Sequence, residues 1–124
     1  MAYSQQALET LLWSSTIYTS EECDGETADH FVPSQDLIDR VDNEFCKFEE
    51  LLESRLPEFD IVEDCKIKCD EFEQLEHDFI LTINGHGAGF WDGDWKSGNM
   101  LTEICEGFRE IGVYLGDDNL IYPC

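Results

Sequence analysis

The segment from Asn84 to Trp95 holds the residues best suited to chemistry. It places His86 among glycines, which let backbone amides approach a ligand, and Asp92 and Asp94 follow soon after. These three side chains form a candidate ligand loop. The alternative interpretation is a tight hairpin whose aromatic residues fill the core beneath it. The chain contains no nucleophile elbow, P-loop, dinucleotide fingerprint or metalloprotease motif, so we expect neither catalysis nor a cofactor.

The cysteines offer a second candidate site. Cys65 and Cys69 would share one face of a helix, and His77 and Cys105 are further possible ligands for zinc. Their spacing differs from the two-residue knuckle of common structural zinc sites, and cysteine is often simply buried as a small hydrophobic residue. We therefore expect free thiols and no bound metal.

Acidic residues dominate the composition. The chain of 124 residues has 29 acidic and seven basic side chains, a formal charge of −22, yet 12% of its residues are aromatic. This apolar content supports a folded core, which distinguishes the chain from a disordered acidic tail. Between Ser20 and Asp78, 21 acidic residues face five basic ones, so the acidic surface belongs to the middle of the chain. Such a surface disfavours nucleic acid and anionic membrane and favours a cationic partner.

The clearest helix runs from Ser34, as its N-cap, to Arg55, just before Pro57. Its apolar stripe has spacings of three and four residues, in the order Leu37, Val41, Phe45, Phe48 and Leu52. Acidic residues occupy its outer face. The candidate partner-binding residues are Asp36, Asp39, Asp42, Glu49, Glu50 and Glu53.

The remaining elements of the N-terminal half are less regular. Residues 3–17 have the pattern of a short amphipathic helix with Ser4 as its N-cap, and a long polar loop follows from Thr19 to Pro33. Residues 59–76 have apolar spacings that favour a helix, although short strands would suit the same residues.

After His77 the pattern becomes that of strands. An apolar run over residues 79–83, a glycine-rich turn and Phe90-Trp91 predict a hairpin; a short helix over 101–108 follows; residues 113–115 and 120–122 predict a second hairpin. We therefore expect a single α+β domain over 1–124. Its acidic helical part covers about 1–76, and its sheet part, about 77–124, is a small antiparallel ββαββ unit against which the helices pack.

No stretch approaches the roughly 18 apolar residues that a membrane-spanning helix needs, and the first residues lack the basic region of a signal peptide. We expect a cytoplasmic protein, monomeric or homodimeric.

Several segments resemble a known family. These are Leu11 to Thr16, His77 to Thr82, the run Asn84-Gly85-His86-Gly87-Ala88-Gly89-Phe90-Trp91-Asp92, Leu101 to Glu103, and Val113 to Tyr122. They look like segments of small uncharacterised proteins of bacteriophages and prophage-bearing bacteria. The chain departs from that family at Gly93, where arginine is frequent, and at Asn119, where glycine is found. The resemblance implies phage origin and a shared fold, but no catalytic residues.

Phage-type ancestry and acidity together suggest a protein that binds and inhibits a nucleic-acid-handling or defence protein of the host as a DNA mimic. Carboxylates three and four residues apart on a helix offer a charge row comparable to neighbouring phosphates. Restriction, CRISPR, nuclease, repair and transcription proteins all have suitable basic channels. The alternatives are a small enzyme or ligand-binding protein using the His86 loop, and an accessory protein whose acidity only confers solubility.

Overall fold

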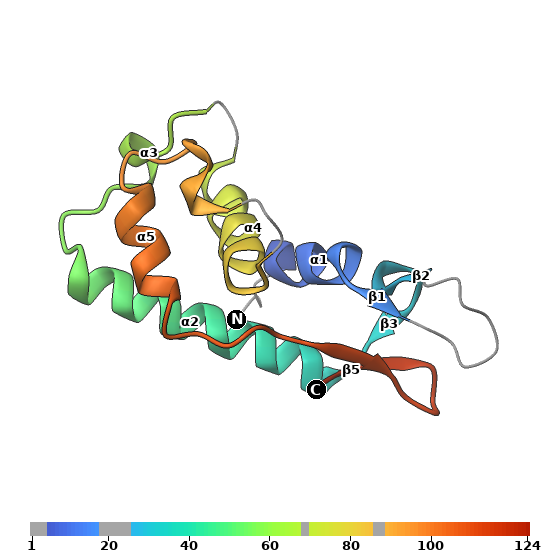
Figure 1. The fold of residues 1–124 in the computed structure, drawn as a ribbon. Helices are drawn as coiled ribbons and strands as arrows, with labels where there is room; N and C mark the ends of the chain where they lie inside the picture. Colours follow the sequence, from blue (N-terminus) through green and yellow to red (C-terminus); the bar gives the residue numbers. More distant parts are fainter. Residues whose placement is uncertain (1–4, 18–25, 68–69, 86–88) are drawn as a thin grey trace.

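The longest helix, α2 (Gln35–Arg55), is the base on which α1, α4 and α5 pack (Figure 1). The computed structural model describes residues 5–17, 26–67, 70–85 and 89–124. The hydroxyl oxygen of Ser34 accepts the backbone N–H of Leu37 at 3.1 Å, which makes Ser34 the N-cap, as the sequence predicts. The predicted apolar stripe is also confirmed, since all five of its members are buried.

Helix α4 (Glu71–Ile83) lies between α1 and α5 above α2 (Figure 1). The expected strand over residues 79–83 is therefore wrong, and so is the hairpin that it would begin. The reason is burial on several sides: Asp78, Phe79, Ile80 and Leu81 are consecutive and all buried. A helix enclosed in this way loses the 3.6-residue alternation that would identify it in the sequence.

Three further helices complete the described helical part. They are α1 (Gln5–Ser14), the single turn α3 (Ile61–Asp64) and α5 (Gly98–Cys105). The predicted amphipathic helix near the N-terminus is confirmed, and the short helix predicted over 101–108 is present three residues earlier, as α5. Ser4 lies outside the described residues. At the start of α1, a side-chain oxygen of Glu76 on α4 accepts the backbone N–H of Ala7 at 3.1 Å. A carboxylate from another helix thus satisfies a free amide of the first turn.

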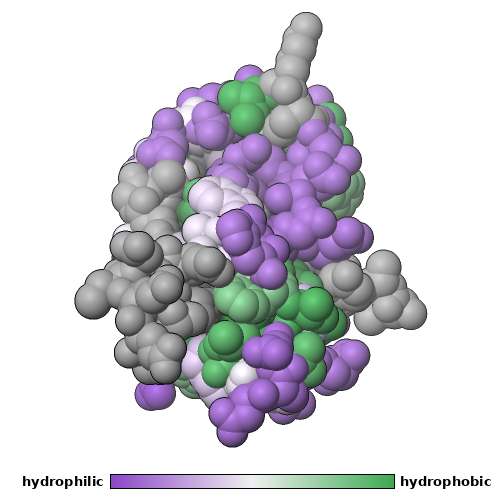
Figure 2. Space-filling view, turned by 90° about the vertical axis from the view of Figure 1, so that its right-hand side faces the viewer, coloured by the Kyte–Doolittle hydropathy of each residue, from purple (hydrophilic) through white to green (hydrophobic). Residues whose placement is uncertain are grey.

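The strands lie at one end of the molecule (Figure 1). Strands β4 (Val113–Leu115) and β5 (Leu120–Pro123) form the predicted second hairpin, and β3 (Val32–Pro33) pairs in parallel with the other edge of β5. This three-stranded sheet is mixed, which corrects the expected antiparallel sheet. Two further short strands, β1 (Thr16–Ile17) and β2 (Glu26–Thr27), pair with each other. Figure 2 views this end and shows hydrophobic residues gathered between hydrophilic ones.

An aromatic cluster lies in the core between the helices. The ring of Phe48 on α2 lies 4.8 Å from that of Phe79 on α4 and 5.7 Å from that of Phe90, centroid to centroid. Phe108, which follows α5, meets Phe79 edge-on at 5.3 Å. These contacts bury aromatic surface from four segments of the chain in one core.

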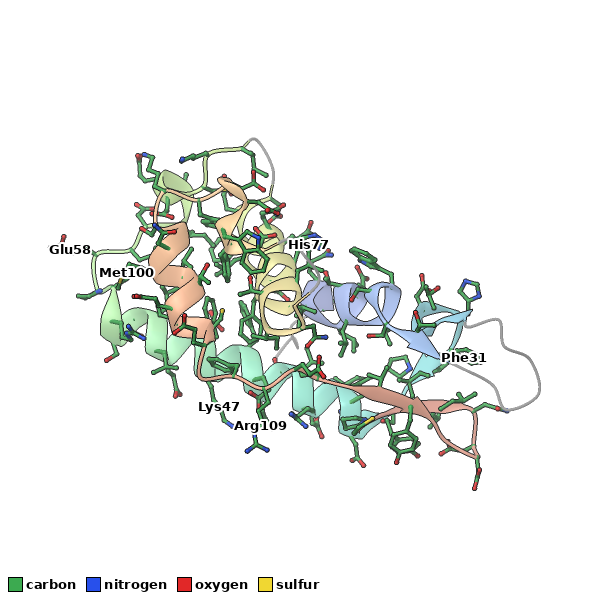
Figure 3. The ribbon with its side chains drawn as sticks, in the orientation of Figure 1. Phe31, Lys47, Glu58, His77, Met100 and Arg109 are labelled. Atoms are coloured by element: carbon green, nitrogen blue, oxygen red, sulfur yellow. The ribbon has the colours of Figure 1, made fainter. Side chains whose placement is uncertain are left out.

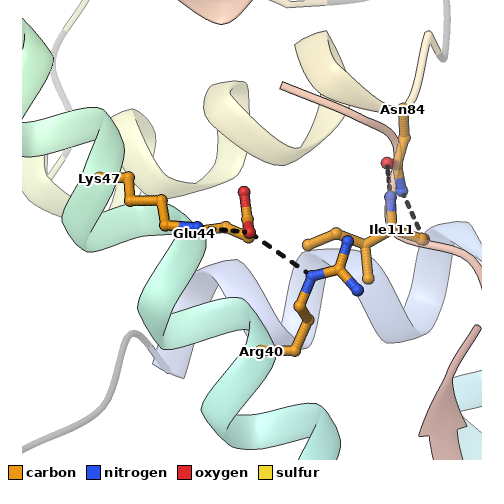
Figure 4. Close-up of polar contacts among 5 residues, drawn as sticks. All are labelled: Arg40, Glu44, Lys47, Asn84 and Ile111. Carbon is orange, nitrogen blue, oxygen red and sulfur yellow. Dashed lines mark hydrogen bonds and ion pairs between the residues drawn. The ribbon is translucent and has the colours of Figure 1, made fainter. Parts of the chain in front are cut away.

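Asn84, at the end of α4, fixes the segment that leads from α5 to the sheet. Its side-chain oxygen accepts the backbone N–H of Ile111 at 2.8 Å, and its amide nitrogen donates to the carbonyl of the same residue at 3.3 Å (Figure 4). The side chain thus acts as a short strand partner for that segment.

The fold is α+β in one domain, as expected. The expected division into a helical part up to about residue 76 and a sheet part after it is wrong. The described part of the chain contains five α-helices and no C-terminal ββαββ unit, because residues 77–83 belong to α4 and Phe90–Asp92 form a single 3₁₀ turn. No helix of the described residues is long and apolar enough to cross a membrane.

Candidate partner-binding surface

Four of the six candidate acidic residues form one row along α2. Asp39, Asp42, Glu49 and Glu53 are separated by three, seven and four residues, so they follow one side of the helix, with Cys46 in the middle. Asp39, Glu49 and Glu53 are exposed, and Asp42 is half-buried. We call these four carboxylates the acidic row.

The other two candidates lie beside the row. Asp36 contributes to a raised pKa of Tyr122, whose main cause is the hydrogen bond to Asp118, so Asp36 lies towards the hairpin. Glu50 lines a groove on the opposite flank of α2. The six residues are thus exposed or half-buried, but they do not form one uniform patch.

The basic residues of α2 lie away from the acidic row. Arg40 and Lys47 both pair with Glu44, at 3.6 Å and 3.5 Å (Figure 4), and Arg55 lies 4.0 Å from Glu103 on α5. Figure 3 shows Lys47 and Arg109 projecting on the same side of α2.

This flank carries a groove of about 570 Å³, which is lined by Arg40, Lys47 and Arg109 together with Glu44 and Glu50. Within the described part of the chain, Asp39, Glu49 and Glu53 form no ion pair with a basic side chain. Arg40 and Lys47 therefore lie on the other flank of α2 from the acidic row, which keeps its negative potential.

Negative charge is concentrated where α2 meets α4. Burial raises the pKa of Glu49, and the nearby carboxylate of Asp42 raises it further. Burial also raises the pKa of Glu76, with additional contributions from Glu49 and Glu73, although the hydrogen bond from Ala7 opposes the shift. Each carboxylate makes its neighbours harder to ionise, and a cation placed here would relieve that repulsion.

The thiol of Cys46, in the middle of the acidic row, is also affected by the neighbouring carboxylates. Burial, Asp42, Glu49 and Glu50 all raise the pKa of its thiol. The thiol therefore stays protonated at neutral pH and is a poor nucleophile.

Glu73, Glu76 and Phe72 of α4 extend this surface, and the sequence interpretation did not include them among the site residues. The three-residue separation of Glu73 and Glu76 was the available signal, because the helix favoured over residues 59–76 contains both, but that spacing does not predict that the segment packs beside α2. Phe72 is 63% exposed, which no periodicity argument would have suggested for a phenylalanine.

The candidate ligand loop is described only in part, since His86 lies outside the described residues. The side chain of Asp92 accepts the backbone N–H of Gly89 at 3.2 Å, and the backbone oxygen of Asp94 accepts the N–H of Lys66 at 2.7 Å. His77 is engaged elsewhere: its Nδ1 lies 3.0 Å from the hydroxyl of Thr10, and its ring stacks on Trp13. The described members of the loop thus have local structural contacts.

The residues considered as possible zinc ligands do not meet as a set in the described part of the chain, which contains no cluster of three or more His, Cys, Asp or Glu residues arranged for a metal ion. Cys69 lies outside the described residues. Burial raises the pKa of Cys105 to about 12, so this thiol is a buried apolar group rather than a thiolate ligand. Cys46, Cys105 and Cys124 have free thiols.

No family model, curated protein or solved structure matches this chain. The resemblance to phage proteins therefore stays a prediction. The structure adds one detail at each departure from that family. Asn119 has a φ of +64°, a conformation that suits both glycine and asparagine, whereas Gly93 has a φ of +93°, which an arginine rarely adopts.

Proposed function

We propose that this chain is an acidic phage-type protein that binds and inhibits a host nucleic-acid-handling or defence protein by imitating the DNA backbone. The observation that supports the proposal is the acidic row on α2, combined with the placement of the helix's basic residues on the opposite flank. A helix with interspersed charges would suffice for solubility and would not need this separation.

The dimensions of the row favour mimicry. Asp39 and Glu53 are 14 residues apart, which corresponds to about 21 Å along a helix. One DNA strand presents roughly six phosphates over that length. Four carboxylates of the row, with Glu73 and Glu76 beside Glu49, give a similar number of negative charges.

The partner is a protein with a basic channel for nucleic acid, of the restriction, CRISPR, nuclease, repair or transcription class. Long-range attraction to a surface of net charge −22 would accelerate association. Binding is then sensitive to salt, and the partner cannot hold the acidic protein and nucleic acid in the same channel.

A neutralised variant tests the proposal. The protein is first used to capture a partner from a bacterial host lysate at low and at high salt, and the purified partner is then titrated. Replacing Asp39, Asp42, Glu49 and Glu53 by Asn or Gln removes the charge of the row and keeps the side-chain sizes. Because several partly desolvated pairs are lost together, we expect affinity to fall by roughly a hundredfold or more, and duplex DNA to compete with the parent protein.

The matched control neutralises four exposed acidic residues outside α2: Glu9, Glu106, Glu110 and Asp117. It changes the net charge equally and should bind within a few-fold of the parent. Equal binding by parent, variant and control, without competition by DNA, would mean that the acidity serves solubility. Loss of binding in a folded His86→Ala protein would instead favour the ligand-loop alternative.

A further inference from the structure

A small apolar groove adjoins the C-terminal half of the acidic row. It lies between the end of α2, the segment that follows it and the start of α4, and its volume is about 270 Å³. Its apolar lining consists of Leu52, Leu56, Pro57, Phe59, Ile61, Phe72 and Leu75. This volume is below the usual 300 to 1,000 Å³ of small-molecule sites, so it suits one or two side chains of a protein partner.

Phe72 is the exposed part of this groove. It lies in the first turn of α4 with its side chain 63% exposed, whereas Leu75, one turn later, is almost fully buried. An exposed aromatic residue beside a buried apolar floor is the kind of feature that contributes most to protein interfaces.

The charges around the groove select the kind of occupant. Glu49 and Glu53 of the acidic row line it, and Glu73 follows Phe72 directly, whereas its lining among the described residues contains no Lys or Arg. A nucleic acid or an acidic segment would be repelled here. A second copy of this chain, with its formal charge of −22, would meet the same repulsion over most of its surface.

We propose that the groove receives an apolar side chain from a basic, amphipathic segment of the partner, whose Lys or Arg side chains pair with Glu49 and Glu53. This inference rests on the proposed function and specifies it. The partner would be recognised by an apolar anchor as well as by charge, which a nucleic-acid mimic needs in order to select one basic protein among many.

Two synthetic peptides test the anchor separately from the charge. One is an amphipathic helical peptide of Leu and Lys, and the other has the same lysines with every Leu replaced by Ala, so both are helical and equally charged. We expect the parent protein to bind the Leu peptide about tenfold more tightly at physiological salt. Phe72→Ala should abolish most of that preference and leave affinity for the Ala peptide unchanged.

Tyr114→Ala is the control, because Tyr114 is another half-exposed aromatic residue and lies on β4, in the sheet. It should keep the full preference. Three results would contradict the proposed role of the groove. They are no preference for the Leu peptide in the parent, failure of both peptides to bind, and an unchanged preference in Phe72→Ala. A parent dimer that dissociates on Phe72→Ala would assign the groove to a second copy and overturn it too.

The two proposals fail differently. Loss of the Leu preference in Phe72→Ala supports the groove, even if the four-residue neutralised variant keeps its host partner and the mimicry is wrong. If Phe72→Ala keeps the preference for the Leu peptide, the proposed role of the groove is wrong, even if the four-residue neutralised variant loses the host partner.

Discussion

The indole N–H of Trp95 donates a hydrogen bond to Oδ2 of Asp78 at 2.7 Å inside the protein. Trp95 is 2% exposed and Asp78 is 3% exposed. The other carboxylate oxygen accepts the side-chain amide of Gln74 at 2.9 Å, so both oxygens have donors. This pair ties the segment after the glycine-rich turn to α4 and explains why a carboxylate is buried there.

Replacing Asp78 by Asn should destabilise the fold by about 1 kcal/mol. Asparagine has only one acceptor oxygen, so either its NH₂ group faces the indole N–H of Trp95, or its oxygen stays with Trp95 and the amide of Gln74 has to rotate so that its own oxygen accepts the new NH₂ group. Chemical denaturation measures the loss. Asp94→Asn is the control: it removes the same charge, and the side chain of Asp94 makes no described hydrogen bond, so a loss as large as that of Asp78→Asn would contradict the argument.

Neighbouring aromatic residues should differ sharply in their effect on stability. The ring of Phe90 is fully buried against Phe48, whereas Trp91 is 44% exposed. Phe90→Ala should lower the free energy of unfolding by about 3 to 5 kcal/mol, and Trp91→Ala by less than about 1 kcal/mol. Thermal unfolding of the two variants compares them directly, and similar melting temperatures would contradict this placement.

The sequence predicts those elements whose burial is one-sided. The stripe of α2 and the second hairpin are amphipathic or bounded by clear turn residues, so local patterns identify them. The second half of α4 is enclosed on several sides, so residues 79–83 have the pattern of a strand, whereas its first residues lie in the segment 59–76, for which the spacings favour a helix. The parallel pairing of β3 with β5 joins residues almost 90 positions apart, and no local pattern contains that information.

The sequence likewise predicts only part of the candidate surface. The acidic row follows from helical spacing alone, because Asp39, Asp42, Glu49 and Glu53 belong to one helix. The contribution of Glu73, Glu76 and Phe72 depends on how α4 packs beside α2, which is a tertiary property. Likewise, burial of Trp95 rather than Trp91 depends on the distant carboxylate of Asp78.

Asn119 offers a test of the hairpin turn. Asn119 is the last residue of a four-residue turn, and its N–H donates to the carbonyl of Gly116 at 3.0 Å. Its φ is +64°. Asn119→Ala should destabilise the protein by about 1 kcal/mol, because alanine tolerates this conformation poorly, while Asn119→Gly should be neutral or slightly stabilising. Equal melting temperatures for the two variants would mean that the turn rearranges readily.

Three carboxyl groups with raised pKa values determine how stability should change with pH. Burial is the main cause for Glu49, Glu76 and Asp78 alike, and neighbouring carboxylates add to it. A raised folded-state pKa means that the folded protein binds protons more tightly than the unfolded chain. These groups therefore weaken the fold fully above their folded pKa values, and the penalty is relieved as pH falls towards the unfolded values near 4.

The melting temperature should accordingly rise as pH is lowered from about 7.5 to 5. Lower self-repulsion of the many exposed carboxylates acts in the same direction, so a specific variant is needed. Glu49→Gln combined with Glu76→Gln removes two of the three groups, and the side-chain oxygen of the glutamine introduced by the second substitution can still accept the N–H of Ala7. This variant should melt higher than the parent at pH 7.5 and gain less on acidification, as measured by scanning calorimetry. The lowered pKa of exposed Asp118 acts only below about 4, outside this window. A melting temperature that falls between pH 7.5 and 5, or an unchanged pH dependence in the double variant, would contradict the crowding of charge between α2 and α4.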